Sequence, residues 1–143
     1  MPGRTFRFQP LLDARRRDEV VCQARYVQCH AEAEAVRCQG EELDRLVGAA
    51  RVRAFADPEH EGVQAWQGYA GVLERQARAA RQQAGELGTL ACEARDELLR
   101  ASRARAALEL LRDRHRAAAA RASRAAEERE RDDWSTCRAT QVR

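Results

Sequence analysis

Two long stretches of the chain, residues 11–53 and 86–134, contain no proline and are dominated by Ala, Arg, Glu, Leu and Gln. A proline inside a helix costs about 3 kcal/mol, whereas these five residue types are good helix formers. In both stretches, small or apolar residues recur at alternating steps of three and four, which is the spacing of a seam between packed helices. The sequence therefore predicts two long helices, each with one face for another helix.

The seam of the first predicted helix begins at Leu12 and continues without a gap. Its positions are mostly small or apolar: Leu12, Arg15, Glu19, Cys22, Tyr26, Cys29, Ala33, Val36, Gly40, Leu43, Val47 and Ala50. These twelve positions indicate one continuous contact with a second helix.

The distal helix has a similar seam, interrupted by one irregular step. It runs through Leu87, Ala91, Ala94, Leu98, Ala101, Arg105 and Leu108, and then through Leu111, His115, Ala118, Ala122, Ala125 and Arg129. The short step after Leu108 predicts local overwinding of the supercoil. Because an alanine seam buries little apolar area, we expect both ends of the hairpin to be mobile without a partner.

The middle of the chain, residues 55–88, interrupts the pattern with Pro58 and five of the eight glycines. The chain is expected to reverse in this segment, and Pro58 is its strongest breaker because it biases Asp57 toward an extended conformation. Residues 63–83 are again helical in pattern, either as a separate short helix or as part of the distal helix. The predicted fold is all-α, an elongated antiparallel two-helix coiled-coil hairpin with a broken middle segment. Its parts are a first helix over 9–54, a turn and short helical segment over 55–88, a distal helix over 86–134 and a flexible tail over 135–143.

Composition argues against several classes of function. Charged residues make up 34% of the 143 residues and aromatics 5%, which fits one long helical domain without a wide core. The net charge is only +3 and the signs alternate, so no basic stripe predicts nucleic-acid binding. No apolar run approaches the roughly 18–20 residues that span a bilayer, and no leader pattern is present, so we expect a cytoplasmic protein without direct membrane insertion. The odd number of cysteines, five, favours reduced thiols.

The sequence offers little catalytic or metal-binding chemistry. The three histidines, His30, His60 and His115, are far apart, and no recognised nucleophile, phosphate-loop or metalloprotease motif is present. Cys22 and Cys29 are seven residues apart, about 10.5 Å along a helix, which is too far for one tetrahedral zinc ion. We expect no enzyme activity, no cofactor and no metal.

Three segments carry a resemblance to a known family. The run FRFQPLLDAR at residues 6–15 places paired leucines before a basic helix, Trp66 and Tyr69 form a W-x-x-Y element, and ALELLRDRHR at residues 107–116 precedes a polar helix that ends near Trp134. In this order and spacing they resemble the flagellar FliJ family across nearly the whole chain. The related stalk proteins of type III secretion injectisomes (YscO-like) share the same plan.

The resemblance implies a protein that acts through other proteins. FliJ-like proteins are antiparallel two-helix coiled coils that are similar to the central stalk of rotary ATP synthases. The implied function is a non-enzymatic stalk that binds the hexameric export ATPase, promotes its assembly and activity, and contacts the cytoplasmic domain of the export-gate membrane protein. Export chaperones are further implied partners, and the implied location is the cytoplasmic side of the inner-membrane export apparatus.

The resemblance also maps two contact regions by position. The export-gate contact maps to Tyr69, Val72, Gln76, Ala79 and Gln83. Two more residues join this expected contact: Leu73 as a substitute for one of the five, and Trp66 as an anchor beside Tyr69, because aromatic residues dominate interface energetics. Val72 stands where the family has a large aromatic residue, and Gln76 where it has an apolar one. The ATPase contact maps to the end where the termini meet: Phe8, Leu12, Arg16, Arg17, Arg112, Arg114, Arg121 and Arg124.

Alternatives to this interpretation remain open at the level of sequence. Trp66 and Tyr69 could simply pack the hairpin near its turn. The stalk could belong to an injectisome rather than a flagellum. The chain could also be a generic structural coiled coil, such as a parallel homodimeric scaffold or an adaptor.

Overall fold

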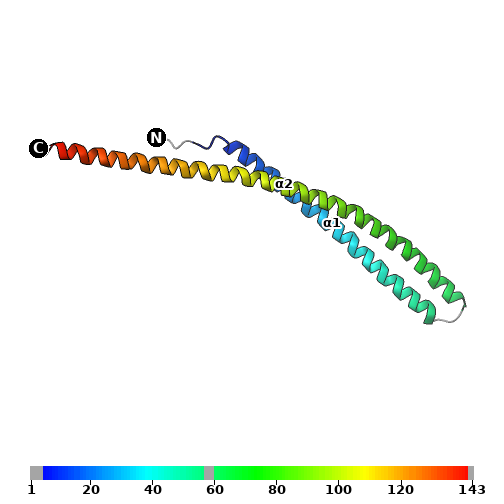
Figure 1. Ribbon diagram of the computed structural model, residues 1–143. Helices are drawn as coiled ribbons and strands as arrows, with labels where there is room; N and C mark the ends of the chain where they lie inside the picture. Colours follow the sequence, from blue (N-terminus) through cyan, green and yellow to red (C-terminus); the bar gives the residue numbers. More distant parts are fainter. Residues whose placement is uncertain (1–4, 57–59, 142–143) are drawn as a thin grey trace. The chain divides into compact units, whose positions relative to one another are not determined.

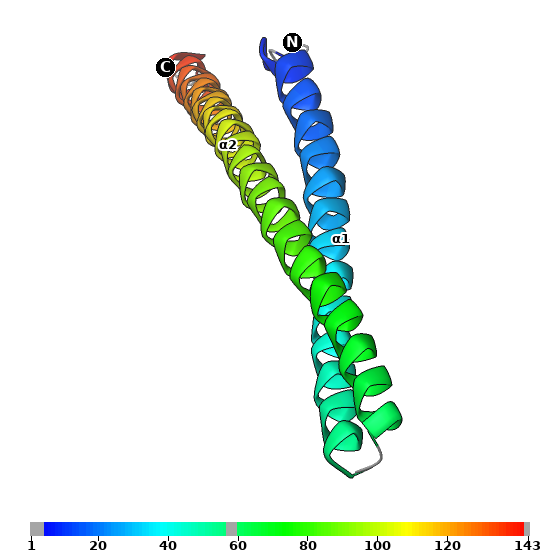
Figure 2. The same cartoon turned by 90° about the vertical axis from the view of Figure 1, so that its right-hand side faces the viewer.

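The computed structural model describes residues 5–56 and 60–141, which form two helices, α1 (Gln9–Ala56) and α2 (His60–Gln141) (Figure 1). No strand occurs in these described residues. The helices lie side by side and run in opposite directions where they leave the connection between Ala56 and His60 (Figure 2). The predicted all-α helical hairpin is therefore confirmed. The predicted breaker, Asp57-Pro58, lies outside the described residues.

The start of α1 follows from local hydrogen bonding. The backbone N–H of Gln9 donates to the Phe6 carbonyl at 2.9 Å, and that of Leu12 donates to the Phe8 carbonyl at 2.9 Å. Pro10 lies in the first turn, where its missing N–H removes no helical hydrogen bond. The Gln9 side chain donates to Asp13 Oδ1 at 2.9 Å and supports the same turn.

The second helix is a single element of 82 residues. Residues 63–83 therefore belong to α2 and do not form a separate short helix. Glycines within the described helix, such as Gly68 and Gly85, each cost about 1 kcal/mol relative to alanine, but no proline follows Pro58 to end the helix. The helix also continues past Trp134 to Gln141, where the sequence predicted a tail, because no breaker occurs there.

Each helix contributes to two compact units, which we describe separately. The central unit is Val20–Leu99 and contains the connection between the helices. The terminal unit combines Met1–Glu19 with Arg100–Arg143.

Small side chains dominate the core of the central unit. Of the eleven buried hydrophobic residues in the described chain, eight are alanines. Leu73, which is 5% exposed, packs with Val47, Ala50 and Ala70. Further along, a Cβ atom placed on Gly40 would lie 3.6 Å from the Cβ of Ala80, so the two backbones approach closely there. The core is thin because the helices meet through short side chains.

The predicted seam of α1 is confirmed almost throughout. Of its twelve positions, only Arg15 is exposed, and the others are buried or half-buried. Cys22 and Cys29 are half-buried there, as expected for small seam residues.

The predicted irregular step in α2 was wrong. In the terminal unit, Leu111 is 47% exposed, whereas the Arg112 side chain is only 17% exposed. The inward positions Arg105, Leu108, Arg112 and His115 keep regular steps of three and four. An arginine can occupy a seam position because its long aliphatic stem covers apolar surface while its charged end reaches water.

Among the described residues of the terminal unit, Leu12 is the one large side chain that is fully buried. At the start of the chain, the Phe6 ring lies 5.8 Å from the ring of His115. From residue 116 to residue 138, the described side chains of α2 are exposed except for the half-buried Ala125. Beyond His115, the described part of α2 therefore has almost no apolar packing.

Replacing Leu73 tests the core of the central unit. Leu73→Ala removes a buried side chain, and we expect the free energy of unfolding to fall by about 2–3 kcal/mol, the lower part of the range for buried leucines, because neighbouring side chains border solvent and can partly close the gap. The measurement is urea denaturation followed by circular dichroism at 222 nm. Leu90→Ala is the matched control on the same helix, since Leu90 is 48% exposed, and it should cost less than about 0.5 kcal/mol. Equal losses for the two variants would contradict this core.

Candidate functional site

One side of α2 in the central unit carries exposed, uncharged residues. Tyr69 is 49% exposed and Val72 is 41% exposed, and three more exposed residues continue the same steps of three and four. Side chains at this spacing lie on one side of a helix. We call this set the uncharged face; its members are Tyr69, Val72, Gln76, Ala79 and Gln83.

Two of the seven residues expected at the export-gate contact lie elsewhere. Leu73 is in the core, so its side chain is not accessible while the hairpin is closed. Trp66 is half-buried and packs against the same core. The remaining five residues are those of the uncharged face. The structure thus separates two core-packing residues from five accessible ones.

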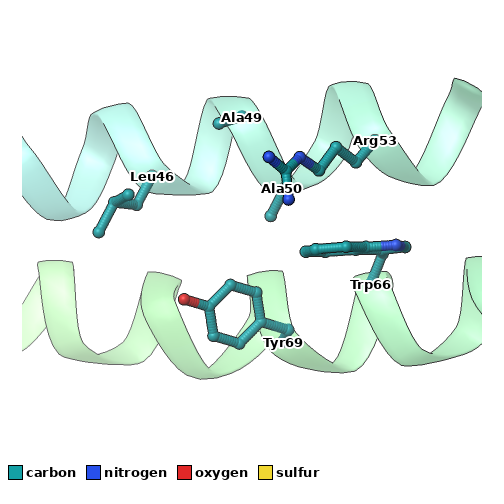
Figure 3. Close-up of a pocket in the computed structure, with 6 residues that line it drawn as sticks. All are labelled: Leu46, Ala49, Ala50, Arg53, Trp66 and Tyr69. Atoms are coloured by element: carbon teal, nitrogen blue, oxygen red, sulfur yellow. The ribbon is translucent and has the colours of Figure 1, made fainter.

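Trp66 and Tyr69 line a groove between the helices (Figure 3). The Arg53 guanidinium lies 5.2 Å from the centre of the Trp66 ring, within the range of a cation–π interaction. The Tyr69 ring meets the Trp66 ring edge-on, with 6.0 Å between centroids. From α1, Leu46, Ala49 and Ala50 complete the lining. Among the described residues that line this groove, Arg53 alone is charged.

The α1 side of this groove was missed by the sequence analysis. Leu46, Ala49 and Arg53 carry no motif, and their place opposite Trp66 depends on where the chain reverses. The sequence left that point open within residues 55–88. Once the reversal lies between Ala56 and His60, antiparallel pairing places the last turns of α1 beside the first turns of α2.

A second groove in the central unit was also missed. It is lined by Arg51, Ala54, Phe55, Val63, Gln67, Ala70, Gly71 and Glu74. Phe55 is 90% exposed, and Arg51 forms an ion pair with Glu74 across the two helices. This groove shares no lining residue with the first.

The residues mapped to the ATPase contact all belong to the terminal unit but differ in accessibility. Leu12 is buried, whereas Phe8 is 47% exposed and its ring lies 5.7 Å from that of Phe6. Arg112 is mostly covered and pairs with the neighbouring Asp113 at 3.1 Å. Four of the mapped arginines are exposed and have no ion pair with another residue in the described part of the chain: Arg17, Arg114, Arg121 and Arg124.

Arg16 instead belongs to a set of linked charges between the helices. It donates a hydrogen bond to Glu109 Oε1 at 2.9 Å, and Arg105 forms ion pairs with Glu109 and with Glu19. We call Arg16, Glu19, Arg105 and Glu109 the ionic cluster. The hydrogen bond from Arg16 lowers the pKa of Glu109, and pairing with Glu19 raises the pKa of Arg105, because each neighbour favours the charged form.

The chemistry of the remaining polar residues is limited. In residues 5–56 and 60–141, no three His, Cys, Asp or Glu side chains gather as metal ligands would. The His30 ring stacks on Tyr26 with 5.7 Å between centroids. Cys38, Cys92 and Cys137 are exposed. Within the described helices, no segment has the length and apolar character needed to cross a membrane.

Comparison with known proteins identifies the family. A family model described as Flagellar FliJ protein matches residues 4–143. Because the match covers essentially the whole chain, this protein belongs to the FliJ family, and the resemblance seen in the sequence is confirmed. Membership indicates a protein related to flagellar export, with a structural rather than an enzymatic part in it. Neither the curated proteins nor the solved structures gave a match.

Replacing Arg53 tests the geometry of the first groove. In a chain carrying Trp134→Phe, so that Trp66 is the only tryptophan, Arg53→Gln should expose the covered face of the indole. We expect stronger acrylamide quenching of Trp66 fluorescence and a loss of about 0.5–1 kcal/mol of stability. Arg45→Gln is the control, because Arg45 pairs within α1 with Glu42 and should leave quenching unchanged. Unchanged quenching in Arg53→Gln would show that the guanidinium does not cover the ring.

Proposed function

We propose that this protein is the central stalk of a flagellar export apparatus and acts by binding other proteins. Family membership supports the export role. The observation that carries the proposal is the uncharged face of α2, where Tyr69 and Val72 are exposed in a chain that is one-third charged. Its proposed partners are the hexameric export ATPase, the cytoplasmic domain of the export-gate membrane protein and export chaperones. Its proposed location is the cytoplasm, at the periphery of the inner-membrane export apparatus.

The uncharged face is the proposed contact for the export gate. Charged residues are depleted from the centres of protein interfaces, and aromatic residues are enriched there. Tyr69 fits the role of an anchor because half of its surface is accessible and its ring is held by the neighbouring Trp66. Gln76 and Gln83 offer amide groups for hydrogen bonds. Leu73 and Trp66 contribute indirectly, by holding α2 against α1.

The exposed arginines of the terminal unit are the proposed contact for the ATPase. Arg121 and Arg124 lie beyond His115, where the described side chains of α2 are almost all accessible. A guanidinium without an ion pair is available for charge-assisted hydrogen bonds to carboxylates of a partner. Arg17, Arg114 and Phe8 belong to the same unit and are accessible as well. Leu12 has a structural role in this proposal, since it is buried.

Replacing Tyr69 tests the gate contact. We expect Tyr69→Ala to weaken binding to the purified cytoplasmic domain of the export gate by about 30-fold, which corresponds to a hot-spot loss of about 2 kcal/mol. Isothermal titration calorimetry measures the dissociation constant. Arg78→Ala is the control, because Arg78 is exposed on α2 outside the uncharged face. If Tyr69→Ala binds as tightly as Arg78→Ala while retaining its helical circular dichroism, this contact is wrong.

Replacing two arginines tests the ATPase contact. We expect the double variant Arg121→Ala/Arg124→Ala to lose about tenfold in affinity for the export ATPase at low salt, because two charge-assisted contacts are removed. ATP hydrolysis and hexamer formation are measured as the variant is added. The matched control removes two exposed arginines of the central unit, Arg75→Ala/Arg78→Ala. Equal stimulation by the two double variants would argue against this assignment.

A further inference from the structure

The terminal unit holds its two helices together differently from the central unit. Ten of the eleven buried hydrophobic residues of the described chain lie in the central unit, and Leu12 alone lies in the terminal unit. Burial of apolar surface is the main source of attraction between helices in water. The first turns of α1 therefore have little apolar packing to keep them on α2.

The ionic cluster occupies the place where apolar side chains would be expected. Glu19 and Arg105 both stand at seam positions of their helices, and the Arg105 guanidinium links Glu19 on α1 to Glu109 on α2. Arg16 adds a second link across the helices through Glu109, at 2.9 Å. The four side chains thus form a continuous set of alternating charges: Glu19, Arg105, Glu109 and Arg16.

Burial distinguishes Arg105 and its two carboxylate partners in this cluster from the other ion pairs between the helices. The side chains of Arg105 and Glu19 are 28% and 21% exposed, whereas those of Arg25 and Glu97 are 58% and 40% exposed. Arg51–Glu74 and Arg81–Asp44 are also open to solvent. Exposed pairs contribute little, but removing one partner from a covered pair leaves a charge without compensation.

We propose that the ionic cluster is a charge-dependent clasp that holds the first turns of α1 on α2 and can open while the central unit stays folded. Opening requires neutralising one carboxylate or drawing a guanidinium away, for which Arg16 is placed at the solvent-exposed end of the cluster. The open state exposes Leu12 and the inward side of α2 from Ala101 to His115. This inference rests on the contacts of the chain itself and does not depend on the proposed partners.

Hydrogen–deuterium exchange on the full-length chain, read by mass spectrometry, tests the clasp. In Glu19→Gln, the Arg105 charge loses its partner on α1, and we expect amides of α1 between residues 12 and 22 to exchange about tenfold faster. Amides between residues 40 and 50 should change less than about twofold, because the central core is intact. Glu97→Gln is the matched control, since it removes the same charge from an exposed pair between the helices, and it should leave both segments within about twofold of the wild type.

A second variant separates the clasp from a general loss of packing. Glu19→Leu/Arg105→Leu replaces the covered pair with two apolar side chains, which can be as stable as the ion pair or more so. We expect residues 12–22 in this variant to stay as protected as in the wild type. The proposal is overturned if Glu19→Gln exchanges like Glu97→Gln, if residues 40–50 open together with residues 12–22, or if the double leucine variant is as open as Glu19→Gln.

Discussion

The structure depends on how closely two helices approach when their facing side chains are alanine and glycine. At Gly40 the added Cβ would lie 3.6 Å from that of Ala80, and eight of the eleven buried hydrophobic residues in the described chain are alanines. Most buried positions of this seam hold alanine, and the larger side chains of Tyr69, Val72 and Phe55 lie outside it and remain accessible at the surface. The thin core is therefore accompanied by apolar and aromatic groups that are available for other proteins.

Ion pairs and buried apolar side chains are distributed unevenly between the central and terminal units. The central unit contains Leu73 and Val47 within its alanine seam, whereas the terminal unit combines one buried leucine with linked ion pairs. Buried leucine and valine contribute more per residue than alanine, because each added methylene removed from water is worth about 0.8 kcal/mol. The central unit is thus suited to hold a contact surface in place. The terminal unit is suited to respond to charge.

Much of the fold follows from the sequence, because the three- and four-residue spacing of small and apolar residues determines which faces of the helices pack together. The seam from Leu12 to Ala50 was predicted nearly position by position. The prediction of an irregular step after Leu108 was wrong. The spacing rule places apolar residues in the seam and so selected Leu111, whereas in the structure the long aliphatic stem of Arg112 occupies the seam. The site was harder to predict. Leu73 was proposed as a substitute contact for the export gate, although its spacing from Ala77 and Ala80 places it in the core. Arg53 could be found only from the register of the two helices.

An engineered disulfide between α1 and α2 is a direct test of their antiparallel register. In a chain whose five cysteines are replaced by serine, Gly40→Cys/Ala80→Cys places two Cβ atoms about 3.6 Å apart, within the usual range for a disulfide. We expect rapid oxidation to a cross-linked monomer under mild conditions, seen by non-reducing electrophoresis. Gly40→Cys/Ala84→Cys, displaced by one helical turn, should cross-link far more slowly. Oxidation to a disulfide-linked dimer, or faster reaction of the displaced pair, would contradict the register.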